Sequence, residues 1–142
     1  MVLVDTNVVS EARKGARAHQ GVRDFFARAH AAGTPLFLSA VTVGELRRGV
    51  ELLRHRNDLA QARLVERWLE RLIDDYADHV LSVDADVAQL WGRLCVPHPE
   101  NAIDKQIAAT ALIHDLTLAT RNVAHFSAPG LRLMNPFELV ER

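Results

Sequence analysis

Two hydrophobic patterns alternate along the chain, and they predict two kinds of element. Short apolar runs are typical of buried β-strands, whereas longer stretches with apolar residues spaced three and four apart are typical of one face of an α-helix. The short runs predict five strands, at residues 2–4, 36–38, 80–83, 116–119 and 131–134. The periodic stretches predict five helices, at residues 22–31, 43–53, 59–76, 85–94 and 103–114.

This alternation of strands and helices predicts the fold class. Parallel strands need a crossover connection, most often a right-handed one through a helix, so we expect a three-layer α/β/α domain with a central, mostly parallel five-stranded sheet. The helices on either side of residues 54–58 can instead pair with each other as a hairpin. The 142 residues contain no internal repeat or linker-like stretch, which indicates a single domain over residues 1–142.

The composition is that of a folded soluble protein, with 49% hydrophobic and 25% charged residues. The net charge of -1 excludes a strongly basic protein that coats nucleic acid, but leaves open a nucleic-acid partner held by local arginines and bound metal. Cys95 is the only cysteine, so an intrachain disulfide and a thiolate zinc cluster are excluded and a reducing cytoplasm is expected. No apolar run reaches the roughly 18 residues of a membrane span, and no export signal is visible.

Polar side chains follow the predicted strands at one edge of the sheet. Asp5 comes directly after the first strand, and Asn122 follows the fourth. Glu45 lies near the start of the helix after the second strand, and Asp104 opens the helix before the fourth. Ligands of open parallel sheets collect at the carboxyl ends of the strands, so three carboxylates from three segments are expected to converge there.

Two of these acids also have a purely structural interpretation. Asp104 can be a first-turn acid that the helix dipole stabilises by roughly 0.3 to 1 kcal/mol. Glu45 can pair with Arg48 on the same helix face. A structural role is harder to give to Asp5, because a carboxylate beside a buried run is costly to desolvate unless a cation or several hydrogen bonds compensate.

Converging carboxylates usually mark a divalent-cation site, because a cation relieves their mutual repulsion. Oxygen ligands favour Mg²⁺ or Mn²⁺ over zinc, and the seven histidines include no HExxH pair. No glycine-rich loop of the kind that cradles nucleotide phosphates is present. The pattern therefore favours metal-assisted hydrolysis.

Four stretches carry a resemblance to a known family. They are VDTNVVSEARK at 4–14, LSAVTVGELRRGVELL at 38–53, IDKQIAATALIHDLTLATRNVAHF at 103–126 and LRLMNPFE at 131–138. In this order and spacing they resemble the PIN-domain ribonucleases, and among these the VapC toxins of bacterial type II toxin–antitoxin systems, close to the FitB-like branch. Together the four stretches span the chain from end to end.

The resemblance implies a function and a site. It places the family's acidic residues at Asp5, Glu45 and Asp104, the three that the strand-end argument also selects. It implies that this site binds Mg²⁺ or Mn²⁺ and cleaves RNA, that a VapB-like antitoxin blocks it, and that the protein forms a homodimer. One departure stands out, since the family often has a fourth acid where this chain has Asn122, or three residues later, at His125. A single firmly bound metal ion is therefore expected.

We assign roles to the site residues as a hypothesis. Asp5 and Asp104 are expected to bind the metal ion, directly or through water, while Glu45 completes the shell or orients the attacking water. Asn122 is expected to hydrogen-bond a ligand or the metal's water, with weaker direct binding as a second possibility. The resemblance implies products with a 5′ phosphate and a 3′ hydroxyl, because a metal-activated water attacks.

Positive and polar residues near these acids are candidates for binding phosphates. Thr6 and Arg121 flank the expected ligands, and Arg121 can equally form an ion pair with an acid of the site. Further arginines downstream of Glu45 can bind the RNA backbone or an acidic antitoxin segment, or simply be solvated: Arg47, Arg48, Arg54 and Arg56.

Two other functions fit part of the pattern. Haloacid-dehalogenase-like phosphatases also place a nucleophilic Asp after the first strand, but they need a second Asp two residues later, where this chain has Asn7. A degenerate PIN module that binds RNA or antitoxin with little cleavage is the non-enzymatic alternative, because the fourth acid is missing.

Overall fold

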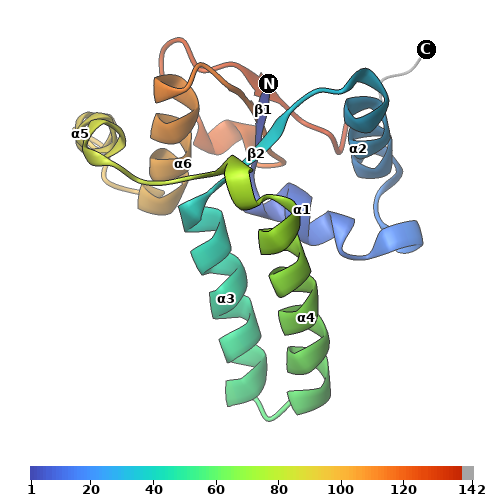
Figure 1. Ribbon diagram of the computed structural model, residues 1–142. Coiled ribbons are helices and arrows are strands. Elements are labelled where there is room, and N and C mark those ends of the chain that lie inside the picture. Colours follow the sequence, from blue (N-terminus) through green and yellow to red (C-terminus); the bar gives the residue numbers. More distant parts are fainter. Residues whose placement is uncertain (139–142) are drawn as a thin grey trace.

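The computed structural model of this protein describes residues 1–138, and within them the strands form one parallel sheet in the order β3-β2-β1-β4-β5. Strand β1 lies in the middle, beside β2 (Figure 1), and it pairs with β4 along its other edge. The parallel five-stranded sheet is the one predicted, although the outer strands are shorter than expected. The strands are β1 (Val2–Val4), β2 (Leu36–Ser39), β3 (Val80–Leu81), β4 (Thr117–Ala119) and β5 (Leu133–Met134).

The predicted helices are also present, with ends shifted by a few residues. The helices are α1 (Thr6–Ala12), α2 (Gln20–Ala32), α3 (Ala40–His55), α4 (Leu59–Asp75), α5 (Ala85–Leu94) and α6 (Ala102–Ile113). Helix α1 was not predicted, because its Val8 and Val9 continue the β-branched run of β1. The Asp5 carboxylate accepts a hydrogen bond from the Thr6 N–H and caps this helix, so the chain turns directly from strand to helix.

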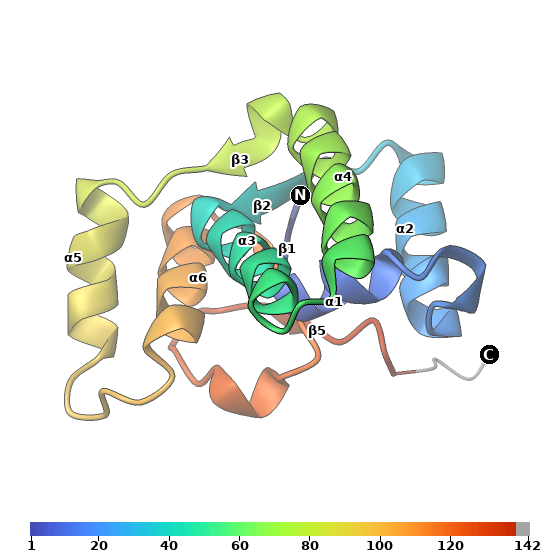
Figure 2. The same ribbon diagram turned by 90° about the horizontal axis from the view of Figure 1, so that it is seen from below.

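The sheet has a helical layer on each face, as Figure 2 shows with α6 and α2 on opposite sides of β1 and β2. Successive side chains of β1 point to opposite faces. Val2 and Val4 pack in a cluster with apolar residues of α1, α2, α3 and α4, whereas Leu3 packs against Ile107 and Ala111 of α6. The α/β/α layering therefore follows from the alternation within β1. Within residues 1–138, no helix is long and apolar enough to cross a membrane.

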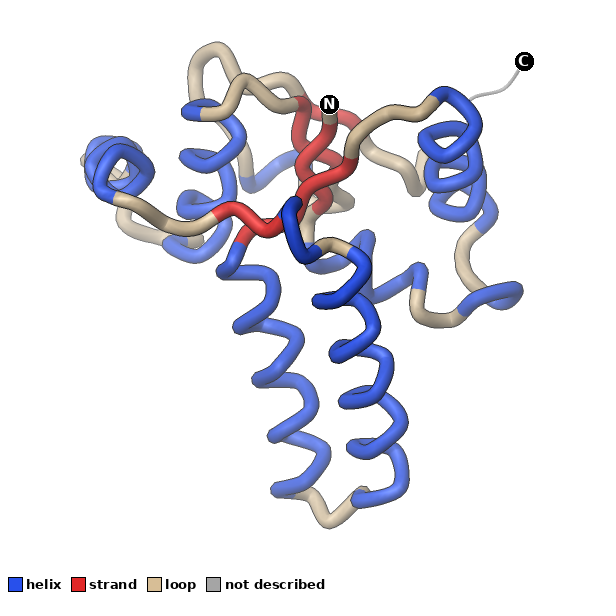
Figure 3. The backbone as a smooth tube through the Cα atoms, viewed as in Figure 1, coloured by secondary structure: helices blue, strands red, loops and turns tan. Residues whose placement is uncertain are grey.

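Helices α3 and α4 form the hairpin that was one of the expectations, and it extends away from the sheet (Figures 1 and 3). Two arginines of α3 point to α4, where Glu66 accepts a hydrogen bond from Arg47 and one from Arg54, each at 2.6 Å. Glu51 lies 2.6 Å from Arg54 as well. Two of the four arginines considered for RNA or antitoxin binding are thus paired within the chain.

Candidate active site

Asp5 stands at the carboxyl end of the central strand, at the point where the strand order reverses. Its backbone N–H donates to the carbonyl of Ala119 at 2.9 Å, which joins the end of β1 to the end of β4. Thr120, the residue that follows β4, is also buried. This is the position where open α/β sheets bind their ligands.

The Asp5 side chain is only 2% exposed, yet all its polar atoms are satisfied. One oxygen accepts the Thr6 N–H at 2.7 Å. The other accepts the Thr120 hydroxyl at 2.7 Å and the side-chain N–H of Asn7 at 3.2 Å. Hydrogen bonds from neighbouring segments therefore hold the carboxylate in one orientation.

The electrostatic surroundings of Asp5 oppose its charge. Burial raises the pKa of this carboxyl above its ordinary value of 3.8, and the hydrogen bonds from Thr120 and Thr6 offset only part of that rise. The negative charges of Asp104 and Glu45 raise the pKa of Asp5 further. The structure thus brings the three predicted carboxylates into one neighbourhood where they repel one another.

Glu45 lies on α3 and is tied to the end of β1 through Thr6. The Thr6 hydroxyl donates to one Glu45 oxygen at 2.7 Å and lies 3.1 Å from the hydroxyl of Thr42. A groove of about 270 Å³ opens beside these residues, lined also by Arg13 and Trp68. Thr6, predicted to bind substrate, thus contacts an acid of the site, and Glu45 borders open space.

Asp104 lies in the first turn of α6, which begins after Asn101 in the left-handed conformation (φ 57°). One Asp104 oxygen lies 2.9 Å from Nδ1 of His125, a residue of the short 3₁₀ turn Val123–His125. This contact was not predicted, because His125 was considered only as a replacement for an acid. His125, at the position where the family resemblance leads us to expect a fourth acid, therefore contacts Asp104.

The segment after β4 contributes polar groups that sequence reasoning missed. Thr120 donates to Asp5 and accepts the N–H of Asn122, and Asn7 accepts the N–H of Arg121 at 3.1 Å. The sequence did contain a signal from which both could be predicted. Asn7 belongs to the DTN stretch, and Thr120 follows a strand directly, as Asp5 does. Asn122 itself is exposed.

Arg121 makes no ion pair with an acid of the site within residues 1–138, so that structural alternative is wrong for the described chain. Its guanidinium lies over the Phe137 ring instead, 4.7 Å from the centroid. This contact ties the segment after β4 to the segment after β5.

The acids do not form a closed metal cage. In the described part of the chain, no three carboxylate, imidazole or thiolate groups lie close enough together to enclose a metal ion. Glu45 and Asp104 each keep one oxygen without a hydrogen-bond partner there. Oxygen donors left open in this way suit Mg²⁺ or Mn²⁺, because Mg²⁺ usually keeps several waters beside one or two carboxylates.

Comparison with known proteins identifies the class. The sequence model of the PIN domain matches residues 2–129, and the chain therefore belongs to the PIN-domain family. Its relatives within that family include the plasmid stability protein StbB of Pseudomonas syringae pv. tomato, 37% identical over 97% of this chain and 99% of the relative. Toxin FitB of Neisseria gonorrhoeae is 34% identical over 96% and 99%, and VapC ribonuclease Y4jK of Sinorhizobium fredii is 35% identical over 97% and 99%.

A solved structure has the same fold along its whole length. It is the structure of FitAB bound to an IR36 DNA fragment, which superposes with a TM-score of 0.79 and 30% sequence identity. The match covers 99% of this chain and 99% of the other. The α/β/α arrangement predicted from the hydrophobic pattern is thus that of the FitB and VapC group of PIN domains.

Proposed function

We propose that this protein is a metal-dependent endoribonuclease and the toxin of a VapBC-type toxin–antitoxin pair. The observation that carries the proposal is the buried Asp5 at the switch point of the sheet, whose charge is opposed by burial and by two further carboxylates. A protein keeps such an arrangement where a ligand of opposite charge binds. The relatives named VapC ribonuclease and toxin support RNA cleavage as the activity.

The chain's own residues have distinct roles in the proposed reaction. Asp5 and Asp104 would hold the Mg²⁺ or Mn²⁺ ion, which supplies a Lewis acid for the phosphoryl oxygens and lowers the pKa of a bound water. Glu45, with one oxygen held by Thr6 and the other without a partner in residues 1–138, orients the attacking water and accepts its proton. Water adds to phosphorus as the bond to the 3′ oxygen breaks, and this oxygen takes up a proton from a solvent water, which leaves a 5′ phosphate and a 3′ hydroxyl.

The surrounding polar groups keep the carboxylates in place during this reaction. Thr120 and Asn7 fix Asp5, and Thr6 fixes Glu45. Asn122, exposed beside Thr120, would hydrogen-bond a water of the metal ion. Arg121 would meet a phosphate only at its exposed edge, because its guanidinium is stacked on Phe137.

The proposed partners are a VapB-like antitoxin and a second copy of this chain. FitB and VapC relatives have been solved as FitAB and VapBC complexes, which supports an antitoxin. For a homodimer, Leu59 and Leu64 of α4 are candidates, since their exposed fractions are 49% and 58%. No large apolar residue of α2 within the described chain is exposed to a similar extent. Cys95, as the only cysteine, fits action in a reducing cytoplasm.

The test is cleavage of total RNA by purified, antitoxin-free protein with Mg²⁺ or Mn²⁺, beside an EDTA control and the Asp5→Asn variant. We expect cleavage in the first sample alone and 5′-phosphate ends on the products. A thermal-melting series with added Mg²⁺ accompanies it, in which only the protein with Asp5 is stabilised. Cyclic 2′,3′-phosphate ends would contradict the mechanism, and folded, metal-loaded protein that cleaves no RNA would leave the degenerate binding module as the function.

A further inference from the structure

A second cavity adjoins the acidic site on the side of Asp104. It has a volume of about 320 Å³ and lies between α5, α6 and the segment that follows β4. His125 connects the cavity to the site, because it lines the cavity and its imidazole lies 2.9 Å from an Asp104 oxygen. The volume is at the lower end of the range of small-ligand sites and suits one nucleotide unit.

The charge of this cavity is opposite to that of the site beside it. Its lining includes the cationic or ionisable side chains of Arg93, His98, Lys105 and His125. Among the residues that the structure describes, no carboxylate lines it. Two acids lie at its margin: Asp104, with an oxygen 2.9 Å from His125 Nδ1, and Glu100, with an oxygen 3.4 Å from His98 Nδ1.

The other two cavities of similar size differ in this respect. The cavity beside α2 includes Asp24 and Glu138, and the groove between α3 and α4 includes Glu45. Of these three cavities in the described part of the chain, the one on the Asp104 side has cationic groups and no carboxylate in its lining. Such a place attracts the flanking phosphates of a chain whose scissile phosphate lies among the acids.

Besides these charged groups, the cavity is lined by apolar residues, which we call its apolar floor: Leu94, Ala108, Phe126 and Pro129. Cationic groups and apolar residues in one cavity form the combination that single-stranded nucleic acid needs, since the backbone requires charge and the base requires an apolar surface. An acidic peptide would use the charges but leave this floor without a counterpart.

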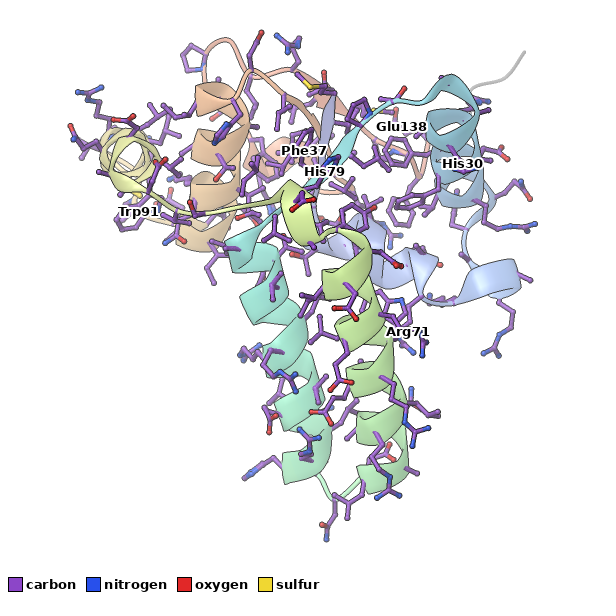
Figure 4. The ribbon with its side chains drawn as sticks, viewed as in Figure 1. His30, Phe37, Arg71, His79, Trp91 and Glu138 are labelled. Carbon is purple, nitrogen blue, oxygen red and sulfur yellow. The ribbon has the colours of Figure 1, made fainter. Side chains whose placement is uncertain are left out.

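The walls of the cavity are fixed before any ligand arrives. Trp91 of α5, labelled in Figure 4, donates its indole N–H to the carbonyl of Ala102 at the start of α6, at 2.9 Å. Lys105 donates to the carbonyl of His98, which ties the α5–α6 connection to α6. A wall held in this way loses little entropy on binding.

We propose that this cavity, which we name the Arg93 pocket, binds one nucleotide of single-stranded RNA next to the cleaved bond. Arg93 and Lys105 contact the phosphate, and the base lies on the apolar floor. The proposal rests on the nuclease function and extends it, because it states on which side of the acidic site the RNA strand continues beyond the cleaved bond. It makes Arg93 and Lys105 substrate-binding residues, in addition to the acidic residues.

The test measures RNA binding and cleavage separately. Binding is followed by fluorescence anisotropy in EDTA with a fluorescein-labelled oligouridylate of about twelve nucleotides, a length that spans a typical single-strand binding site. The variants are Arg93→Gln, Lys105→Gln and the double variant. Arg71→Gln is the matched control, since Arg71 is an exposed helical arginine on the opposite side of the molecule (Figure 4).

Each pocket variant is expected to weaken RNA binding about tenfold, as for a lost hydrogen bond to a charged group. The plot of log Kd against log salt should lose about 0.7 of slope per phosphate contact removed. In cleavage assays KM should rise while kcat changes little, and Arg71→Gln should change neither. Arg93 lies on a different helix from Asp104 and is exposed, so its variant tests the pocket without altering the first turn of α6.

Unchanged affinity and salt slope in both single variants would overturn the proposal. So would a polyglutamate peptide that binds with the same dependence on Arg93 and displaces the RNA, because the pocket would then hold an acidic peptide. A wild-type protein that cleaves no RNA but binds it through Arg93 would overturn the nuclease function and retain the pocket. Cleavage with unaltered KM in all pocket variants would retain the nuclease function and overturn the pocket.

Discussion

Carboxylates occur in two opposite settings in this molecule, at the edge of the sheet and on the α3–α4 hairpin. At the sheet edge Asp5 is buried beside Asp104 and Glu45, and its pKa is raised. On the hairpin, hydrogen bonds from Arg54 and Arg47 lower the pKa of Glu66 to about 2. The surroundings of the carboxylate therefore disfavour its charged form at the sheet edge and favour its charged form on the hairpin.

This difference indicates that the carboxylates of the sheet edge serve function and that the ion pairs of the hairpin serve stability. The hairpin provides Glu66 with two arginines from the facing helix, so the charge of this acid needs nothing from outside the chain. The sheet edge provides hydrogen-bond donors to orient the acids but no side-chain cation within the described residues to neutralise Asp5. A native fold keeps such an uncompensated cluster where a ligand supplies the missing charge.

The largest test applies the same substitution to both regions. Glu45→Gln should lower the rate of RNA cleavage by about 10²-fold or more, because the water loses the carboxylate that orients it and accepts its proton. Glu66→Gln should leave that rate unchanged, because Glu66 contacts only arginines of the hairpin. Rates on one RNA substrate at saturating Mg²⁺ give the comparison, with circular dichroism to verify folding.

Equal loss of cleavage in the two variants would break the separation. It would mean that the hairpin takes part in the reaction and that its ion pairs serve more than stability. A loss confined to Glu66→Gln would reverse the assignment of the two regions.

The second test removes one orienting hydrogen bond from the sheet edge. Thr6→Val keeps the shape of the side chain but takes away the hydroxyl that donates to Glu45 at 2.7 Å. We expect kcat to fall about tenfold and stability to fall by about 1 kcal/mol, as for a typical lost hydrogen bond. Thr6→Ser, which keeps the hydroxyl, should recover most of kcat. Loss of stability without loss of kcat would show that Thr6 is only structural.

The third test measures how the contribution of Asp5 to stability changes with pH. The folded-state pKa of Asp5 lies above its ordinary value of 3.8, so its contribution to stability is fully present below that value and is lost as the pH rises through the folded-state pKa. Asn does not titrate. The Tm of the wild type relative to Asp5→Asn should therefore fall as the pH rises above about 4, in EDTA. A difference in Tm that rises with pH would contradict a raised pKa.

Much of this comparison could be predicted from the sequence. The strand runs and helical periods predicted the sheet and its layers, and the carboxylates at the strand ends predicted the acidic site. These signals are local, since each depends on the spacing of residues within one element.

What was missed depends on contacts between distant segments. The contact of His125 with Asp104 joins two elements on either side of β4, and the pairing of Glu66 with Arg47 depends on the register of two helices. Helix α1 was missed for another reason, because Val8 and Val9 favour a strand and only the cap at Asp5 turns the chain. Composition and period carry no information on such contacts.

The smallest effect is expected from the hairpin itself. The pKa of Glu66 is lowered from 4.5 to about 2, so its contribution to stability is present above pH 4.5 and is lost as the pH falls toward 2. Because these side chains are only partly buried, salt screens their attraction, and Glu66→Gln should lower Tm only slightly at pH 7. The difference in Tm from the wild type should shrink on acidification and in high salt. This pH trend is opposite in sign to that of Asp5.

The matched control for this last measurement is Glu70→Gln, on the same helix and without an ion pair in the described chain. Melting curves of the three proteins at pH 7 and at about pH 3, in low and high salt, separate a paired glutamate from an unpaired one. If both variants melt alike, the arginine pairs contribute nothing measurable, as is common for surface ion pairs. The hairpin would then owe its rigidity to its apolar face. Of the two regions compared, the sheet edge would be the one in which the surroundings of a carboxylate change the stability of the protein.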